Sequence, residues 1–364
     1  MKKKKVLTSA FSNLYTDQRI EKVCKTLYDN GYSVELIGQD WGGAGKMERP
    51  YPFSQIHLVS KSLKTAYFEF NWKLYQVLKK KADKNTILHA NDIDALLPNY
   101  LIAKKLNIPL VFDSHEIFTE MPAIQGKASQ KIWRKLETWL LPKMRFMMTE
   151  SQSYADWFKN AYGVDAVVVR NIPRKITITP DFPENNPKII LYQGAINPFR
   201  GLGQTILAMH DVDAKLLIAG DGPMKKTYEE QVKKENLGHK VQFLGKLIPT
   251  DLREVTKKAD MGMSLEENGG VSYLYSLPNK VSDYIQARVP LVMINFPEMK
   301  RVYNEFKVGE MIENHDPKTI SAAFNKVLKN GRTHYLSELE KASQTLCWEN
   351  EEQKILALFE KASQ

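Results

Sequence analysis

Residues 259–293 read ADMGMSLEENGGVSYLYSLPNKVSDYIQARVPLVM, and this stretch decides the fold. Its opening run ADMGMSL is typical of a short buried strand. Gly269 and Gly270 follow in a loop where the backbone can approach a ligand closely. Pro278 then fits the start of a helix, and a further strand is expected from Leu291. The order of strand, glycine-bearing loop, helix and strand indicates a parallel α/β unit.

The expected start of this helix has the chemistry of an anion site. A helix N-terminus carries roughly half a positive charge on its free N–H groups. Lys280 lies in the first turn, and the two features together favour a phosphate. Asp283 follows about one turn later, within reach of a ribose hydroxyl in the same pocket. The alternative is an ordinary capped loop before a structural helix.

The rest of the chain continues the alternation of strands and helices. An apolar strand is expected at 6–10, a helix at 17–30 and a second strand at 33–37. This is the opening of a doubly wound sheet. The first strand is not followed by G-x-G-x-x-G, which weakens the case for a dinucleotide-binding dehydrogenase. A second α/β series begins at 188–194, so the chain is expected to form two α/β domains.

Length and composition agree with a cytoplasmic protein of two domains. The 364 residues suit two domains that each bury a core. Cys24 and Cys347 are too few for a disulfide framework, which favours a reducing compartment. The lysines at 2–5 are not followed by the apolar run of a signal peptide. A membrane span is not expected either, because the sequence has no apolar run of about 18 residues.

The positive charge is concentrated in the N-terminal half. The whole chain has a net charge of +10, and residues 1–180 hold 28 Lys and Arg against 17 Asp and Glu, a net +11. The remainder holds 24 against 25. This asymmetry predicts an anionic partner for the N-terminal half, such as a membrane surface or a diphosphate-linked lipid. The alternative is a set of solvated lysines on helix faces.

Two helices of the N-terminal half carry more apolar residues than one core stripe needs. In 63–78 a core stripe at positions 63, 67, 70, 74 and 78 is flanked by a second stripe of Phe68, Trp72 and Tyr75. A helix buried on two sides is favoured over an interfacial helix that rests on a membrane. In 131–141, core packing is likewise expected for Ile132, Trp133, Leu136, Trp139 and Leu140, while the basic face of this helix leaves contact with a membrane open.

His115 is a candidate functional residue of the N-terminal half. It follows the apolar strand 109–113, and ligands of open parallel sheets bind at the carboxyl ends of strands. An imidazole there can donate to a sugar hydroxyl or share a proton near neutral pH. Asp92 and Asp94 have the D-x-D spacing of a metal-diphosphate site, but Asp92 is expected to cap a helix instead. No metal site is therefore predicted.

The stretch 259–293 resembles the donor-site signature of family 4 glycosyltransferases, the retaining enzymes of the GT-B fold. The resemblance rests on Pro278-Asn279-Lys280, followed by Asp283 and Tyr284 and then by Pro290-Leu291-Val292. Two further matches are Asp113-Ser114-His115-Glu116 and the loop Gly220-Asp221-Gly222-Pro223.

The sequence also departs from the family pattern. Asp283 stands where a Glu is commoner, and Gln286-Ala287-Arg288-Val289 lacks the usual glycine. The loop between the two acids is longer than in the plain pattern. The first acid is therefore either Glu266 or Glu267.

The resemblance implies two Rossmann-like doubly wound domains with a cleft between them. An acceptor-side domain would occupy 1–172, with a C-terminal helix at 349–364 that packs back onto it. A linker at 173–187 would lead to a nucleotide-sugar-binding domain at 188–348.

The resemblance further implies a metal-independent, retaining hexosyltransferase. It would move a sugar from a nucleotide diphosphate sugar of the UDP or GDP type, with no other cofactor, to a hydroxyl of a glycan or lipid-linked acceptor. The setting would be surface polysaccharide synthesis at the cytoplasmic face of the membrane. The catalytic residues would be His115, Arg200 and Lys280, with the two cations stabilising the diphosphate. The donor-binding residues would be Gly194, Gly220, Gly222, Glu266, Glu267, Asn268, Gly269, Gly270, Leu277, Pro278, Asn279 and Asp283.

Two other classes of function are compatible with the same residues. A nucleotide-sugar epimerase of the same fold would also use carboxylates and a His, but it would need no acceptor. A non-catalytic anion-binding module would bind nucleic acid through the basic half. The sequence lacks an aromatic-basic RNA motif, so nucleic acid is not the expected partner.

Overall fold

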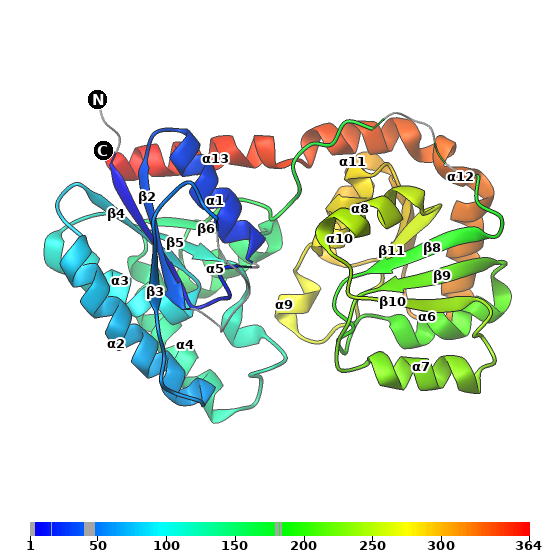
Figure 1. The fold of residues 1–364 in the computed structure, drawn as a ribbon, viewed down its shortest axis with the longest axis horizontal. Coiled ribbons are helices and arrows are strands. Elements are labelled where there is room, and N and C mark those ends of the chain that lie inside the picture. Colours follow the sequence, from blue (N-terminus) through cyan, green and yellow to red (C-terminus); the bar gives the residue numbers. More distant parts are fainter. Residues whose placement is uncertain (1–3, 16, 40–47, 179–181, 183) are drawn as a thin grey trace. The chain divides into compact units, whose positions relative to one another are not determined.

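The computed structural model describes residues 4–15, 17–39, 48–178, 182 and 184–364 (Figure 1). The chain divides into two compact units. Unit 1 consists of Met1–Asn171 and Glu351–Gln364, and unit 2 of Ile172–Asn350. Each unit is built on one parallel sheet, with helices between most of the successive strands. The prediction of two Rossmann-like α/β domains is confirmed.

The sheet of unit 1 has the strand order β3-β2-β1-β4-β5-β6-β7. The chain direction across the sheet reverses between β1 and β4, and this switch point is where open α/β sheets bind ligands. The strands are β1 (Lys5–Ala10), β2 (Ser33–Gln39), β3 (Phe53–Ile56), β4 (Thr86–Asn91), β5 (Leu110–Ser114), β6 (Phe146–Thr149) and β7 (Val167–Val168).

The helices of unit 1 connect these strands, and the C-terminal helix joins them from Glu351 onward. They are α1 (Gln18–Asp29), α2 (Leu63–Lys81), α3 (Ile93–Leu106), α4 (Ala128–Leu140), α5 (Gln152–Tyr162) and α13 (Trp348–Ser363), with short 3-10 turns at η1 (Phe118–Glu120) and η2 (Leu141–Lys143). In α13 the buried ring of Phe359 lies 5.5 Å from the ring of His89 and 6.2 Å from that of Tyr32. The last residues of the chain therefore complete the core of unit 1.

The helix α2 buries one stripe, not two. Phe70 and Leu74 are fully buried, but Phe68 is 77% exposed and Trp72 64% exposed. The expectation of burial on two sides is therefore wrong. The physical reason is geometric, because Phe68 lies about 200° around the helix from Phe70, and periodicity alone does not tell which stripes meet a partner. Leu63, at the start of the expected core stripe, is also exposed.

The helix α4 shows the same departure. Leu140 is buried, whereas Ile132 is 64% and Trp139 47% exposed. Core packing does not account for these two side chains, so that prediction is wrong. Trp133 instead packs edge-on against Tyr67 of α2, with ring centroids 5.1 Å apart. This contact places α4 beside α2.

The sheet of unit 2 has the strand order β10-β9-β8-β11-β12-β13. Its strands are β8 (Lys188–Gln193), β9 (Ala214–Ala219), β10 (Val241–Gly245), β11 (Met261–Ser264), β12 (Leu291–Ile294) and β13 (Gly309–Ile312). Its helices are α6 (Leu202–Ala208), η3 (Met209–Asp211), α7 (Lys225–Lys234), α8 (Pro249–Lys258), α9 (Val271–Leu274), α10 (Asn279–Gln286), α11 (Pro297–Phe306) and α12 (Pro317–Thr345). The switch point of this sheet lies between β8 and β11.

The stretch 259–293 forms β11, the short α9, α10 and the start of β12. Gly262 in β11 leaves room for the buried ring of Tyr284, since a Cβ there would lie 2.6 Å from that ring. The hydroxyl of Tyr284 donates to the carbonyl oxygen of Leu191 in β8 at 2.8 Å. Tyr284 thus fixes α10 on the sheet beside the switch point.

The segment 173–187, expected as a linker, is grouped with unit 2. The amide of Ile176 donates to Gln286 Oε1 at 3.0 Å, and Asn185 Nδ2 donates to Asp260 Oδ2 at 2.8 Å. These contacts bind both ends of the segment to unit 2.

Candidate functional site

Lys280 and Arg200 meet at one carboxylate in unit 2. Lys280, in the first turn of α10, donates from Nζ to Glu266 Oε1 at 2.7 Å. Arg200, in the loop between β8 and α6, has Nη1 3.8 Å from the same oxygen. Glu266 follows β11. Segments far apart in sequence thus bring two cations and one anion together beside the switch point.

Two aromatic rings pack against these cations. Lys280 Nζ lies 4.3 Å from the centroid of the Tyr192 ring, and Arg200 Cζ lies 4.9 Å from that of Tyr273. The hydroxyl of Tyr192 donates to the carbonyl oxygen of Ala195 at 2.7 Å, which fixes that ring. The directions of both cations are therefore set by packing as well as by Glu266.

Glu266 is charged although it is buried. Burial alone would raise the pKa of Glu266, but the Lys280 ammonium and the hydrogen bonds from Lys280 and Ser264 outweigh burial and lower that pKa below its ordinary value. Two cations against one carboxylate leave an excess positive charge at the N-terminus of α10, where the helix dipole adds to it. Such a place favours an anion.

The carboxylate of Glu267 contacts different residues from that of Glu266. Its Oε1 accepts from the amide of Gly201 at 3.1 Å, and its own amide donates to the carbonyl oxygen of Phe199 at 3.0 Å. Gly201 has φ +69, and a Cβ there would lie 2.1 Å from the carbonyl oxygen of Leu265. Glu267 therefore holds the turn that carries Arg200, whereas Glu266 contacts the cations directly.

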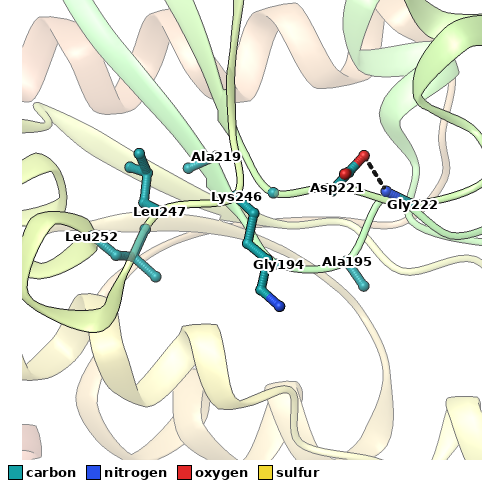
Figure 2. A pocket seen from close by; sticks show the side chains of 9 residues that line it. Gly194, Ala195, Ala219, Asp221, Gly222, Lys246, Leu247 and Leu252 are labelled. Carbon is teal, nitrogen blue, oxygen red and sulfur yellow. Dashed lines mark hydrogen bonds between the residues drawn. The ribbon is translucent and has the colours of Figure 1, made fainter. Parts of the chain in front are cut away.

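A pocket of about 630 Å³ lies at the carboxyl ends of β8, β9 and β10 (Figure 2). In Figure 2, Lys246 lies between the leucines of the pocket, Leu247 and Leu252, and its glycine-bearing side at Gly194. A Cβ on Gly220 would lie 1.9 Å from the carbonyl oxygen of Gly194, so this close approach requires glycine. A Cβ on Gly222 would similarly lie 2.5 Å from the carbonyl oxygen of Ile196. The pocket is lined by Gly194, Ala195, Ala219, Gly220, Asp221, Gly222, Lys246, Leu247 and Leu252.

The pocket adjoins the cation site at Gly194. The position that a Cβ would take on Gly194 is 3.7 Å from Lys280 Cε. A volume of this size suits a small-molecule ligand. A ligand in the pocket with an anionic group at its Gly194 end would therefore meet Lys280.

Asp283 is held at the same edge of the sheet. Gln193, the last residue of β8, donates from Nε2 to Asp283 Oδ2 at 3.0 Å. Thr256 Oγ1 in turn donates to Gln193 Oε1 at 2.7 Å, which sets the direction of the amide. The carboxylate of Asp283 thus lies about one turn of α10 beyond Lys280, in an orientation fixed by two other elements.

The remaining predicted donor-binding residues lie between β11 and α10. Asn268 is exposed, and its Oδ1 accepts from the amide of Gly270 at 3.2 Å. Gly269 lies against Phe199, since a Cβ there would be 2.8 Å from that ring. Leu277 and Pro278 are half-buried before α10, and the exposed Asn279 is its first residue. Gly269 is thereby placed beside the turn that carries Arg200.

His115 lies among carboxylates in unit 1. Its Nδ1 is 3.4 Å from Asp92 Oδ2, and its Nε2 is 3.4 Å from Asp113 Oδ2 and 3.2 Å from Asn91 Oδ1. Arg19 donates from Nε and Nη2 to the two oxygens of Asp113 at 2.9 and 2.6 Å. The cluster stands at the carboxyl ends of β4 and β5, beside the switch point of this sheet.

His115 is an imidazolium at neutral pH. Burial lowers the pKa of this ring, but Asp92 and Asp113 outweigh burial and raise it to about 10. Burial would likewise raise the pKa of Asp113, but Arg19 and His115 hold it below its ordinary value. A charged ring has two N–H groups, and here one faces Asp92 and the other faces Asp113 and Asn91. A pKa this far above 7 does not favour the expected sharing of a proton near neutral pH.

The expectation that Asp92 caps a helix is wrong. Asp92 occupies the N-cap position of α3, but its side chain makes no capping hydrogen bond there. Its Oδ1 instead accepts from the amide of His115 at 2.9 Å. The φ of Asp92 is +58, which is uncommon for a residue other than glycine and recurs where a functional geometry is imposed. Asp92 positions His115.

Sequence reasoning missed several residues of the unit 2 site. Tyr192 and Gln193 end β8, and Lys246 follows β10. Their position at the carboxyl end of a parallel strand is the signal that was available for finding them.

Within the described residues, no three His, Cys, Asp or Glu side chains come together as ligands for a metal ion. None of the helices in the same residues has both the length and the apolar content that crossing a bilayer requires.

Comparisons with known proteins identify both halves of the chain. The model of the glycosyl transferases group 1 matches residues 175–344, and that of Glycosyltransferase Family 4 matches residues 18–177. A glycogen synthase of Mycobacterium tuberculosis is 25% identical over 187 residues, which cover 48% of this chain and 45% of that protein. The match thus spans about half the length of this curated relative.

Solved structures share the fold over the whole chain. A sucrose-phosphate synthase from Thermosynechococcus elongatus has a TM-score of 0.80 at 12% identity and covers 99% of both chains. HepE from Anabaena, solved in complex with UDP, has a TM-score of 0.73 at 14% identity, over 98% of this chain and 100% of that one. The two family models together run from residue 18 to residue 344, and with this fold the chain belongs to the group 1 glycosyltransferases of family 4, which have the GT-B fold.

Proposed function

We propose that this chain is a retaining glycosyltransferase that moves a hexosyl group from a nucleotide diphosphate sugar to a hydroxyl of a glycan or lipid-linked acceptor. The donor is of the UDP or GDP type. The observation that carries the proposal is the convergence of Lys280 and Arg200 on Glu266 at the N-terminus of α10. Retention of configuration is taken from the family.

The charges of this cluster fit a departing diphosphate. When the bond between the anomeric carbon and the donor phosphate breaks, negative charge grows on the phosphate oxygens. Lys280, Arg200 and the N-terminus of α10 supply positive charge where that growth occurs. Arg200 keeps its charge and offers a planar fork of N–H donors, which suits two phosphate oxygens at once.

The other residues take roles that follow from their places. The pocket beside Gly194 holds the nucleoside, and Asp283, oriented by Gln193, accepts from a ribose hydroxyl. Glu266 contacts the donor sugar, and the His115 imidazolium of unit 1 donates to a sugar hydroxyl. For an acceptor of this class, we assign the reaction to surface polysaccharide synthesis at the cytoplasmic face of the membrane. The net charge of +11 in residues 1–180 supports that place.

The test is donor turnover in variants of the two cations. Thermal-shift titration with UDP, GDP and ADP first selects the base, because a ligand that binds the native state raises the melting temperature. Release of the nucleoside diphosphate is then measured for wild type, Arg200→Ala and Lys280→Ala, with Arg253→Ala, an exposed arginine of α8, as the control. We expect both site variants to lose at least about 100-fold in turnover and the control to keep it.

Two outcomes would replace the proposal. Unchanged transfer by the Arg200→Ala, Lys280→Ala double variant would show that the two cations take no part in the reaction. Conversion of the donor sugar into an epimer when no acceptor is present would assign an epimerase instead.

A further inference from the structure

The helix α2 presents an aromatic face to solvent. Phe68 and Trp72 are 77% and 64% exposed and lie one turn apart. The half-buried Tyr75 follows on the same side. Contiguous exposed aromatic surface of this kind is unusual on a soluble domain and marks an interaction site.

Lysines flank this aromatic face at both ends. At about 100° per residue, Lys64, Phe68, Trp72, Tyr75 and Lys79 fall within an arc of about 80°, and we call this set the α2 face. Lys64 and Lys79 are exposed, as is the neighbouring Lys80. Within the described residues, none of these three lysines forms a salt bridge, whereas Lys73 of the same helix pairs with Glu69. The charges of the α2 face therefore remain available.

The neighbouring helix α4 has a similar composition. Its exposed residues include Ile132, Lys135 and Trp139, which share one side of the helix. The Tyr67–Trp133 contact keeps α4 beside α2. Eight of the ten exposed large hydrophobic side chains of the described residues belong to unit 1, so the apolar exposure coincides with the half that has the positive charge.

We propose that the α2 face docks on a bilayer that contains anionic phospholipids. Aromatic side chains enter the interface at the level of the headgroups, while lysines at the two ends contact lipid phosphates with their ammonium groups. The inference deepens the proposed function, on which it rests for the lipid-linked acceptor, by assigning the surface that meets the membrane.

The charge pattern favours a bilayer over a second copy of the chain. A two-fold contact places the same patch on both partners. An antiparallel pair of α2 faces would set Lys64 opposite Lys79, and a parallel pair would set each lysine opposite its own copy. Both arrangements oppose like charges, which disfavours association. An anionic lipid surface is complementary to the same residues.

The test is sedimentation of the full chain with vesicles. The wild type is mixed with vesicles of phosphatidylcholine that contain about one third phosphatidylglycerol, and separately with pure phosphatidylcholine, at low and high salt. We expect binding to the anionic vesicles that weakens with salt. In the Phe68→Ser, Trp72→Ser variant, the partition coefficient should fall at least about tenfold. Ile248→Ser, which removes an apolar side chain of similar exposure in unit 2, should bind as the wild type does.

The contribution of the lysine charges to vesicle binding is tested with two charge-reversal variants, one in α2 and a matched control in α7. Lys79→Glu with Lys80→Glu reverses two lysines in the last turn of α2, and Lys233→Glu with Lys234→Glu reverses two in the last turn of α7. Both variants have the same net charge and the same placement relative to a helix dipole. The first should lose binding to anionic vesicles, and the second should retain it.

Each result decides the inference. Failure of the wild type to bind anionic vesicles, or equal binding by the Phe68→Ser, Trp72→Ser variant, overturns it. A change of oligomeric state in that variant would assign the α2 face to a second copy instead. Sugar transfer to a short soluble acceptor is measured in parallel. Vesicle binding without transfer contradicts only the proposed function, and transfer without vesicle binding contradicts only the docking surface.

Discussion

Lys280 and Glu266 form a buried ion pair, with Nζ 2.7 Å from Oε1 and side chains that are 8% and 1% exposed. A pair so little exposed is sensitive to the loss of one partner, because the other charge then stays buried without compensation. The same pair is the centre of the proposed diphosphate site. Stability and activity therefore depend on it in separable ways.

Lys280→Met should affect both properties, and a second substitution should restore only one. We expect turnover to fall by about 100- to 1,000-fold and the free energy of unfolding by about 3 kcal/mol. The Lys280→Met, Glu266→Gln double variant should recover most of the stability, since neither buried charge of the pair remains, while its turnover stays low. Urea denaturation and initial rates measure the two effects. Recovery of activity together with stability would mean that Lys280 is only structural.

Arg200→Lys should lose turnover with little change in stability. Arg200 is partly exposed and its Nη1 lies 3.8 Å from Glu266, so the fold depends on it weakly. A lysine keeps the charge but not the planar fork of donors or the stacking on Tyr273. We expect a loss of at least about tenfold in kcat with the melting temperature unchanged. Rates equal to wild type would show that charge alone suffices.

Gly220→Ala should abolish nucleotide binding. An added Cβ would lie 1.9 Å from the carbonyl oxygen of Gly194, so the two turns must separate and the pocket must change shape. Gly238→Ala is the matched control, because a Cβ there meets nothing within 4 Å. Calorimetric titration with UDP and GDP should show no binding by the first variant and wild-type affinity for the second. Binding by Gly220→Ala would place the nucleoside elsewhere.

His115 should make stability depend on pH in the alkaline range. Its pKa is raised from 6.5 to about 10 in the folded chain, so its contribution is complete below pH 6.5 and is lost as pH rises towards 10. The free energy of unfolding of the wild type should exceed that of His115→Gln most at pH 6, with the difference shrinking up to pH 10. Urea denaturation at several pH values measures it. A difference that grows with pH would contradict the assigned charge.

The sequence pattern predicted the α/β alternation, the position of His115 after a strand and that of Lys280 in the first turn of a helix, because apolar runs and glycine turns are local signals. It did not predict which stripe of α2 is buried, since Phe68 and Phe70 are equally apolar and only the neighbouring elements decide. Nor did it separate Glu266 from Glu267. Adjacent residues point in different directions, and the contacts of each carboxylate depend on segments distant in sequence. Asp92 was misassigned for the same reason, because its partner His115 follows another strand.

The return of residues 351–364 to unit 1 bears on the order in which the protein folds during synthesis. The ribosome makes Phe359, which fills a place beside His89 in the core of unit 1, only after all of unit 2. Although domains nearest the N-terminus generally fold first, here the contiguous second unit can finish while the first still waits for its last helix. A nascent chain stalled before residue 351 would therefore expose an incomplete N-terminal core to chaperones and proteases.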